Sequence, residues 1–307
     1  MVGIRQIEVY IPERRISNYE RKEELGITDD FITDKLGITY LSRMGPEQDT
    51  SDLCCMAFQN LRGRAGIDPS SIQVLIVCTQ NPDYNLPHTS AVVHGKLGLP
   101  ESCAAFDISL GCSGYVYGLA VVQSFMQLNG MQQGLFFTAD PYSRIIDPND
   151  KSTSVLFGDA ATVTLISNDS VFRLGRFTFG TRGKGSHHLI CREKKLHMNG
   201  REIFNFAAST VPPDIHRVLE ANGLTIKDID RFLLHQGSKF IVDFLAKKLG
   251  LPPEKTPFVI EEYGNTVSSS IPIMIKPLLN DLSVKQILIT GFGVGLSWAS
   301  GILTRSS

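Results

Sequence analysis

Apolar residues along this chain recur with two periods, one typical of strands and one typical of helices. Residues 74–79 form a continuous apolar run of strand length, as expected for a strand that is buried on both faces of a sheet. Residues 113–128 space Val116, Leu119 and Phe125 as a long buried helix would. Amphipathic patterns predict further helices over residues 52–65, 213–222 and 238–249. This alternation of strands and helices indicates an α/β protein with a largely parallel sheet covered on both faces.

The second half of the chain repeats the order of elements found in the first half. The segment Lys-Leu-Gly-Leu-Pro occurs at residues 96–100 and again at 248–252, and the strand-like run at 135–138 has a counterpart at 287–290. The matches keep one order and a nearly constant separation, which chance explains poorly. We therefore predict two copies of one α/β unit, over residues 1–168 and 169–307.

One segment interrupts this pattern. Residues 182–199 are polar and basic and show no clear periodicity. They are expected to form a surface loop that one copy has and the other lacks.

Composition and charge exclude several classes of protein. Of the 307 residues, 42% are hydrophobic and 20% are charged, which supplies ample material for a core. The net charge of −1 provides no global basic field for nucleic acid or an anionic membrane. No run approaches the roughly 18 apolar residues of a membrane span, and no export signal is visible. The six cysteines contain no C-x-x-C motif, so we expect reduced thiols in a cytoplasmic protein.

Three polar residues occupy equivalent places at the ends of strand-like runs. The triplet Gly-Cys-Ser around Cys112 in the first copy corresponds to the triplet Gly-Asn-Thr around Asn265 in the second, and Cys78 corresponds to His235. Side chains at the carboxyl ends of strands face the ligand crevice in α/β proteins. A helix that starts just after Cys112 would favour its thiolate through the helix dipole. We therefore predict that Cys112 is a nucleophile and that His235 and Asn265 act beside it.

Two other patterns resemble a dinucleotide-binding motif and a metal site, but their residues do not fit either. In the glycine-rich run 291–296 the third glycine of a dinucleotide-binding motif falls on Leu296, and no room remains for a βαβ unit. These glycines instead let the backbone approach a reacting carbonyl. The pair His187 and His188 has only Glu193 as a nearby carboxylate, so no metal site is predicted.

At these residues the sequence resembles the β-ketoacyl-acyl carrier protein synthase III family of the thiolase-like superfamily. The nucleophile motif is matched by residues 106–115, the histidine motif by 235–238, the Gly-Asn-Thr motif by 264–266 and the C-terminal signature by 291–298. The resemblance runs nearly end to end. It implies a thiolase-like fold of five αβαβα layers made of two pseudo-symmetric halves.

The resemblance also implies a decarboxylative Claisen condensation in two steps, without metal, flavin or nicotinamide. Cys112 would take an acyl group from an acyl thioester, while the backbone N–H groups of Cys112 and Val294 form the oxyanion hole. His235 and Asn265 would then donate hydrogen bonds to the carbonyl of a malonyl thioester as carbon dioxide leaves. The starter is acyl-coenzyme A in this reading, and the product is a β-ketoacyl thioester.

Several positions depart from the family pattern. Phe31, Lys35 and Lys151 stand where relatives often use Trp and two Arg to bind coenzyme A, and lysine lacks the bidentate fork of arginine. On the helix that docks the carrier protein, Lys247 and Lys248 are retained. Other docking positions carry Phe240 and Asn205 in place of basic residues.

Leu86 stands where a partner subunit's Phe usually closes the acyl pocket. Its smaller side chain predicts a pocket that accepts a medium-length acyl chain, and this requires the expected homodimer. The identity of the starter, the acceptor and the pathway stays open. Two alternatives also remain: acyl transfer to a nucleophile other than a malonyl thioester, and a non-catalytic partner subunit of a condensing enzyme.

Overall fold

The computed structural model describes residues 2–306, which form nine strands of one extended sheet, two small two-stranded sheets and seven α-helices. The helices are α1 (Lys22–Leu25), α2 (Thr50–Ala65), α3 (Thr89–Leu97), α4 (Gly114–Leu128), α5 (Gly200–Ala221), α6 (Lys239–Leu249) and α7 (Ser270–Ile275). The strands are β1 (Gly3–Tyr10), β2 (Arg15–Ser17), β3 (Tyr40–Ser42), β4 (Val74–Cys78), β5 (Ala104–Ile108), β6 (Gln133–Ala139), β7 (Ala161–Ser167), β8 (Phe172–Thr181), β9 (Leu189–Arg192), β10 (Lys195–Met198), β11 (Arg231–Leu234), β12 (Gln286–Gly293) and β13 (Ser297–Arg305).

The large sheet has the strand order β11-β12-β13-β8-β1-β7-β6-β4-β5. Its two parts meet where β1 pairs with β8 over only two residue pairs, Gly3 with Arg173 and Ile4 with Phe172. The sequence repeat aligns β4 of the first copy with β11 of the second, and each of these strands pairs in parallel with at least one neighbour. The repeat is therefore visible as two similar strand sets joined along one short edge.

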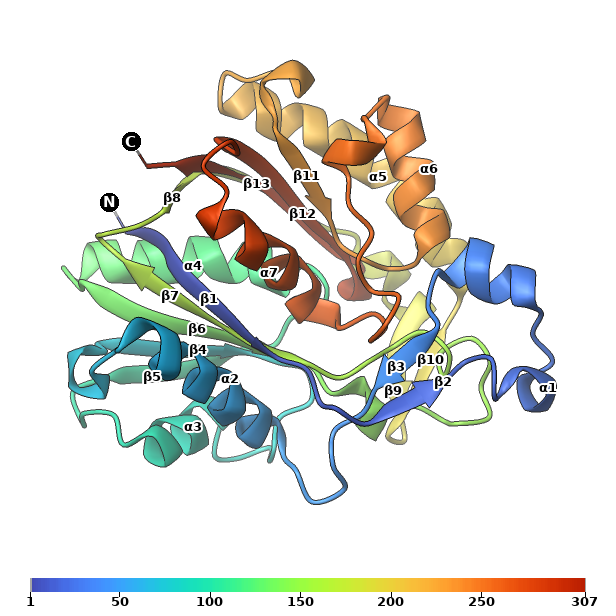
Figure 1. Cartoon of the computed structure of the whole chain (residues 1–307), viewed down its shortest axis with the longest axis horizontal. Helices are drawn as coiled ribbons and strands as arrows, with labels where there is room; N and C mark the ends of the chain where they lie inside the picture. The colour runs from blue at the N-terminus through green and yellow to red at the C-terminus, as the bar shows by residue number, and fades with distance from the viewer. Residues whose placement is uncertain (1, 307) are drawn as a thin grey trace.

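Helices and strands alternate in five layers, as the resemblance predicted (Figure 1). Helices α2 and α3 cover one outer face, and α5 and α6 cover the other. Helices α4 and α7 lie in the middle, since α4 contacts β4 and β6 on one side and β12 and β13 on the other. The predicted helix over residues 113–128 is this central helix, and the side chains of Val116 and Leu119 are fully buried there.

The expectation of a largely parallel sheet is wrong. Among the described strands of the large sheet, only β4 with β5, β4 with β6, and β11 with β12 pair in parallel. The middle strands β13, β8, β1 and β7 pair antiparallel. A continuous apolar run indicates that a strand is buried on both faces, but burial by itself does not fix whether the strand pairs parallel or antiparallel.

Two local predictions are also corrected. Residues 182–199 form a short helical segment followed by the hairpin of β9 and β10, not an irregular loop. The hairpin buries Leu189 and Leu196, whose alternation with polar residues is a strand pattern of period two. Residues 258–260, the strand-like run that precedes Asn265 in the sequence repeat, form no strand.

Helix α5 is much longer than predicted. It begins at Gly200, where Asn199 caps it by accepting a hydrogen bond from the Glu202 N–H, and it continues through Pro212 and Pro213. The two prolines suggested a helix start because proline usually ends a helix from within. Its early start brings Gly200 and Arg201 to the cavity described next.

Candidate active site

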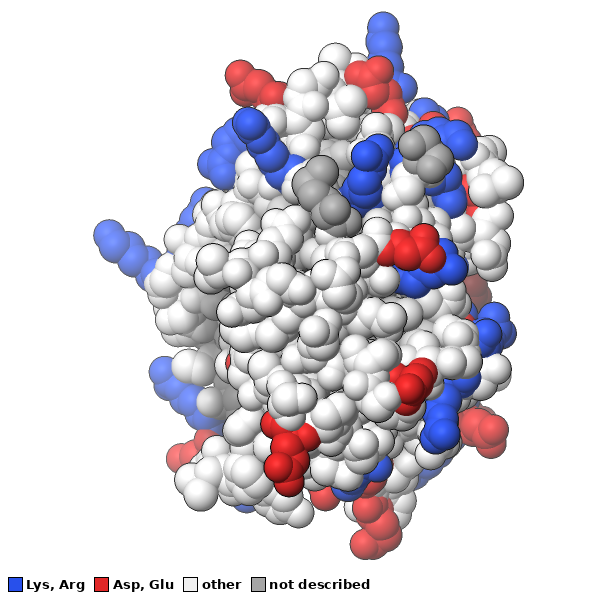
Figure 2. Space-filling view, turned by 90° about the vertical axis from the view of Figure 1, so that its left-hand side faces the viewer, with Lys and Arg blue, Asp and Glu red and all other residues white. Residues whose placement is uncertain are grey.

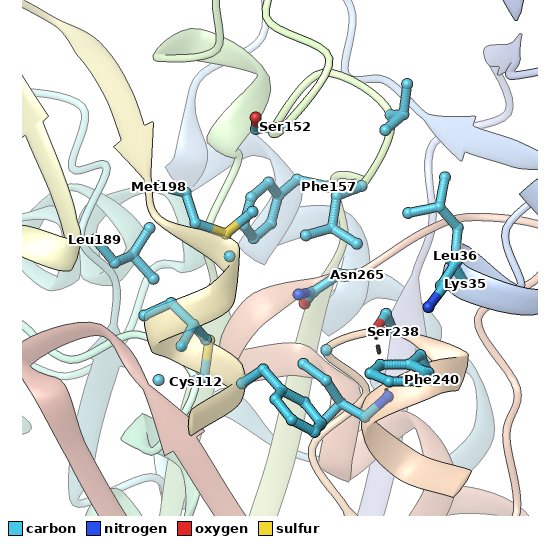
Figure 3. A pocket seen from close by; sticks show the side chains of 18 of the residues that line it. Lys35, Leu36, Cys112, Ser152, Phe157, Leu189, Met198, Ser238, Phe240 and Asn265 are labelled. Atoms are coloured by element: carbon cyan, nitrogen blue, oxygen red, sulfur yellow. Dashed lines mark hydrogen bonds between the residues drawn. The ribbon is translucent and has the colours of Figure 1, made fainter. Parts of the chain in front are cut away.

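A cavity of about 550 Å³ brings the predicted catalytic residues together. Cys112, His235 and Asn265 all line it, and they come from the turn before α4, the end of β11 and the turn before α7 (Figure 3). Most of the remaining lining is apolar, including Leu156, Phe157, Leu189, Met198, Ile203, Phe204 and Phe292. The cavity therefore suits a long apolar group that ends at a polar reaction centre.

Cys112 lies in a tight turn that the sequence Gly-Cys-Ser forms between β5 and α4. The Gly114 N–H donates to the Gly111 carbonyl at 2.7 Å, and α4 follows with Ser113 as its N-cap residue. Burial, with a smaller contribution from the negative charge of Asp140, raises the pKa of the Cys112 thiol to about 12. Burial thus acts against the helix terminus, which was expected from the sequence to favour the thiolate.

Backbone N–H groups nevertheless face the sulfur of Cys112. Hydrogen bonds from the N–H groups of Val294 and of Cys112 itself lower the pKa of the thiol, against the larger effect of burial. These are the two N–H groups that the sequence predicted for an oxyanion hole. Their direction toward the sulfur places two donors next to the atom that would carry an acyl group.

The glycines of the run 291–296 are required by the close approach of β12 to Cys112. A Cβ atom on Gly293 would lie 2.9 Å from the Cys112 sulfur, and one on Gly291 would lie 2.5 Å from the Cys112 carbonyl oxygen. Because these glycines have no side chain, the backbone of β12 can pack directly against Cys112. This close packing accounts for the glycine-rich run without a bound nucleotide.

His235 follows the last residue of β11 and is 2% exposed. Its backbone N–H donates to the Thr290 carbonyl at 2.8 Å, and its ring packs edge-to-face on Phe292. The ring nitrogen Nδ1 lies 2.8 Å from the hydroxyl of Ser270. Burial lowers the pKa of His235 to about 3, so the imidazole is neutral at physiological pH.

Asn265 is held by its backbone and by one end of its amide. Its N–H donates to the Leu156 carbonyl and its carbonyl accepts from the Gly158 N–H, both at 2.9 Å. The side-chain oxygen accepts a hydrogen bond of 2.9 Å from the Val267 N–H. Within residues 2–306 the amide nitrogen has no hydrogen-bond partner, which leaves it available to donate into the cavity.

Cationic and aromatic side chains surround the mouth of the cavity. Phe31, Lys35 and Lys151 line it as the resemblance predicted. Lys35 and Phe240 lie together, apart from Cys112 in Figure 3, with the Lys35 ammonium 4.2 Å from the centre of the Phe240 ring. Among the described residues no carboxylate lies within ion-pair distance of Lys35 or Lys151.

Sequence reasoning missed two residues at this mouth. Arg201 adds a third cation, and Phe240, which was considered only for carrier docking, lines the cavity. Arg201 escaped notice because the start of α5 was placed too late. A signal did exist, since Asn199 followed by Glu202 is a helix-start pattern.

Three other predicted residues lie outside the cavity lining. Leu86 is 83% exposed on the surface of the single chain. Lys247 and Lys248 are exposed in the last turn of α6, where the Lys248 ammonium donates to the Ala208 carbonyl. The cavity of one chain therefore contains the three predicted catalytic residues and the mouth residues, whereas the predicted acyl stopper and the predicted docking lysines lie on the outer surface.

Within residues 2–306 no three His, Cys, Asp or Glu side chains are grouped as metal ligands would be. None of the helices in that part of the chain combines the length and the apolar character that crossing a bilayer requires.

Two family models match the segments of the chain that carry this site. Residues 106–183 match the model of 3-oxoacyl-[acyl-carrier-protein] synthase III, and residues 219–305 match the model of its C-terminal part. A β-ketoacyl-[acyl-carrier-protein] synthase III of Caldanaerobacter subterraneus is 33% identical, with 99% of this chain and 98% of that protein covered. The corresponding protein of Streptococcus sanguinis is also 33% identical, with 98% of each chain covered.

Solved structures are similar over the same extent. The 3-oxoacyl-(acyl-carrier protein) synthase of Burkholderia xenovorans superposes with a TM-score of 0.92 at 34% identity, covering 99% of this chain and 94% of the other. A priming β-ketosynthase from the R1128 polyketide biosynthetic pathway superposes with a TM-score of 0.90 at 27% identity, covering 100% and 97%.

Proposed function

Because the chain belongs to the β-ketoacyl-[acyl-carrier-protein] synthase III family of acyltransferases, we propose that it primes acyl-chain synthesis by joining an acyl-coenzyme A starter to a malonyl thioester. A Claisen condensation in fatty acid synthesis is the reaction of this family. The observation that carries the proposal for this chain is the convergence of Cys112, His235 and Asn265 on one apolar cavity with unpaired cations at its mouth.

In the first step the sulfur of Cys112 attacks the thioester carbonyl of the starter. A bond forms between this sulfur and the acyl carbon, coenzyme A leaves as the thiol, and the Cys112 proton is transferred to it. The N–H groups of Val294 and Cys112 stabilise the oxyanion that develops on the carbonyl oxygen. Burial raises the pKa of this thiol and hydrogen bonds from the same two N–H groups lower it, so these groups assist the loss of its proton.

In the second step a malonyl thioester takes the place of coenzyme A. Its carbon–carbon bond to the carboxylate breaks, carbon dioxide leaves, and the electron pair passes into an enolate. Hydrogen bonds from the neutral ring of His235 and from the amide of Asn265 stabilise the enolate oxygen. The enolate carbon then attacks the acyl group on Cys112, which releases the sulfur and the β-ketoacyl thioester.

At the mouth, Lys35 and Lys151 contact the phosphates of coenzyme A, and Phe31 packs on its adenine. The exposed Lys247 and Lys248 on α6 form the docking surface for an acyl carrier protein that supplies the malonyl group. The reaction needs no cofactor and takes place in the cytoplasm. The halves over residues 1–168 and 169–307 each supply part of the site, with Cys112 from the first and His235 and Asn265 from the second.

A homodimer completes the acyl pocket in this proposal. The outer face of α4 exposes Val121 and Leu128 beside Phe179 of β8, and β5 is an edge strand of the large sheet. On the side where β4, β5 and α4 reach the left edge of Figure 1, charged side chains are sparse at the centre of the face (Figure 2). Exposed apolar groups beside an edge strand favour association with a second copy. Leu86 would then close the partner's acyl pocket.

The mass of the intact protein after incubation with acyl-coenzyme A thioesters tests the proposal. We expect one acyl increment on the native chain, none on Cys112→Ala, and an unchanged increment on Cys191→Ala, which removes an exposed thiol. Octanoyl should be transferred faster than acetyl if Leu86 leaves a long pocket. Addition of a malonyl thioester should then release carbon dioxide and the β-ketoacyl product in equal amounts.

Three outcomes contradict parts of this proposal. Acylation that persists in Cys112→Ala contradicts the nucleophile. Loss of the acyl group without carbon dioxide release favours transfer to another nucleophile. A monomer in solution contradicts the role of Leu86.

A further inference from the structure

Residues 267–270 lie directly behind the two hydrogen-bond donors of the site. This turn, Val-Ser-Ser-Ser, connects Asn265 to α7, and the four side chains are buried. It contacts Asn265 at one end and His235 at the other. The proposed enolate step needs both donors to point their protons at one oxygen, so whatever fixes their orientation affects that step.

The Val267 N–H fixes the amide of Asn265. An amide can present either its oxygen or its nitrogen to a ligand, and the two ends have opposite hydrogen-bonding roles. Because the Asn265 oxygen already accepts from the Val267 N–H at 2.9 Å, the NH₂ group is the end left for the cavity.

Ser270 fixes the ring of His235 in a comparable way. The Ser270 hydroxyl lies 2.8 Å from Nδ1 of His235 and 3.1 Å from the Val267 carbonyl, and it has a single proton to donate to one of these two acceptors. That carbonyl already accepts a hydrogen bond from the Ser270 backbone N–H, so it does not require the hydroxyl proton. A hydroxyl that donates to Nδ1 leaves the ring proton on Nε2, the nitrogen at the far side of the ring.

The turn itself is held in an unfavourable conformation by anchors on both sides. Val267 has a φ of 54°, which a β-branched residue rarely adopts. Ser268 donates to the carboxylate of Asp140, and Ser269 bonds to the hydroxyl of Thr138 at 2.8 Å. Both partners lie at the end of β6, in the other half of the molecule. A strained residue that the surroundings hold in place is typical of a functional site.

We propose that Ser270 is a positioning residue that keeps His235 in the tautomer with its proton on Nε2, while the Val267 N–H presents the amide of Asn265 in its donating orientation. The turn thereby presets both donors before the malonyl thioester arrives. This inference rests on the proposed decarboxylative function, because only the enolate step uses His235 and Asn265 together as donors to one oxygen.

The test separates the two half-reactions in matched variants. Ser270→Ala removes the partner of Nδ1, whereas Ser51→Ala removes an equally buried hydroxyl of α2 that contacts Lys96 and lies outside both the turn and the cavity lining. Acylation is measured by intact mass, and decarboxylation by carbon dioxide release from malonyl-coenzyme A. We expect Ser270→Ala to slow decarboxylation about tenfold, the effect of one lost hydrogen bond, and to leave acylation within about threefold.

The remaining variants and a spectroscopic measurement separate positioning from a general structural role. Ser51→Ala should keep the native ratio of decarboxylation to acylation, and Ser270→Thr, which restores the hydroxyl, should recover most of the decarboxylation. The nitrogen-15 resonances of His235 in the native protein should show a protonated Nε2 and an unprotonated Nδ1.

Each contrary result has a distinct meaning. Equal ratios in Ser270→Ala and Ser51→Ala, or a protonated Nδ1 in the native protein, overturn the role of Ser270. Absence of carbon dioxide release from the native protein contradicts the proposed function instead, and the nitrogen-15 resonances still decide the tautomer. If Ser270→Ala does not fold, Ser270→Thr and the resonances provide the test.

Discussion

The two ends of the cavity are built in different ways. At the inner end Cys112, His235 and Asn265 are buried, and each is held by hydrogen bonds or by the close packing of β12. At the mouth Lys35, Lys151 and Arg201 are exposed, and no carboxylate among the described residues lies within ion-pair distance of them. Preorganised groups stabilise a transition state because they need no reorientation, whereas exposed cations attract phosphates over a range of positions. Changes at the inner end should therefore affect chemistry, and changes at the mouth should affect binding.

The largest expected effect comes from Asn265→Asp. The carboxylate keeps an oxygen for the Val267 N–H but replaces the donating NH₂ with an acceptor. Decarboxylation of malonyl-coenzyme A should fall roughly 10²–10³-fold, as for the loss of one oxyanion donor, with little change in acylation. Asn205→Asp, on the exposed surface of α5, is the matched control and should behave as native. Equal losses in both half-reactions would contradict the separation of roles.

Gly293→Ala should come next. Its methyl group would lie 2.9 Å from the Cys112 sulfur, a distance that forces a shift of the nucleophile or of β12. We expect acylation to slow about 100-fold, since displacement of a reacting group by about 1 Å has effects of that size. Gly95→Ala, where a methyl group meets open space, should leave the rate unchanged. An equal rate in both variants would show that the backbone at Gly293 can move without consequence.

Burial of neutral His235 predicts a loss of stability in acid. The pKa of His235 is about 3 in the folded chain and 6.5 in the unfolded chain, so below pH 6.5 the unfolded chain binds a proton that the folded chain does not. This should remove about 2 kcal/mol of unfolding free energy between pH 8 and pH 5.

The comparison of native protein with His235→Gln by denaturant unfolding isolates this contribution. Burial raises the pKa of Asp140 to about 6, which favours the folded state as pH falls, but this residue is common to both proteins. A pH dependence that His235→Gln does not reduce would mean that the ring is protonated in the folded protein.

The smallest effects are expected at the mouth. Lys35→Ala, Lys151→Ala and Arg201→Ala should each lower kcat/KM for acyl-coenzyme A about three- to tenfold, the size of an exposed charge contact. The decrease should shrink at high salt. Acyl-pantetheine, which lacks the phosphates, should be unaffected, as should the control Lys227→Ala. Equal losses with acyl-pantetheine would assign these side chains to the reaction centre.

Sequence reasoning worked best where one residue type is required by local geometry. The turn around Cys112 and the start of α4 follow from Gly-Cys-Ser before an apolar helix pattern, and the structure places both there. Strands β4 and β12 were likewise predicted from apolar runs. The predicted domain boundary and residue roles stay predictions until they are measured.

Sequence reasoning failed where a local structure or a pKa depends on contacts with residues that are distant in the sequence. The acidity of Cys112 reflects burial beneath β12 and the charge of Asp140, neither of which the local turn reveals. The hairpin of β9 and β10 reached the cavity through Leu189 and Met198, although its polar residues suggested a surface loop. The antiparallel direction of the strands in the middle of the sheet could not be predicted, because β1 and β8, which pair there, come from different halves of the chain.

The sequence by itself determined the internal repeat, the layered α/β architecture and the three residues that are predicted to act at the inner end of the cavity. These follow from periodicity and from short motifs, which are properties of neighbouring residues. Only the tertiary structure decided that His235 is neutral, that Asn265 donates rather than accepts, and that Arg201 joins the mouth. Charge state and hydrogen-bond direction depend on the groups that surround a side chain in space, and those groups come from both halves of the chain.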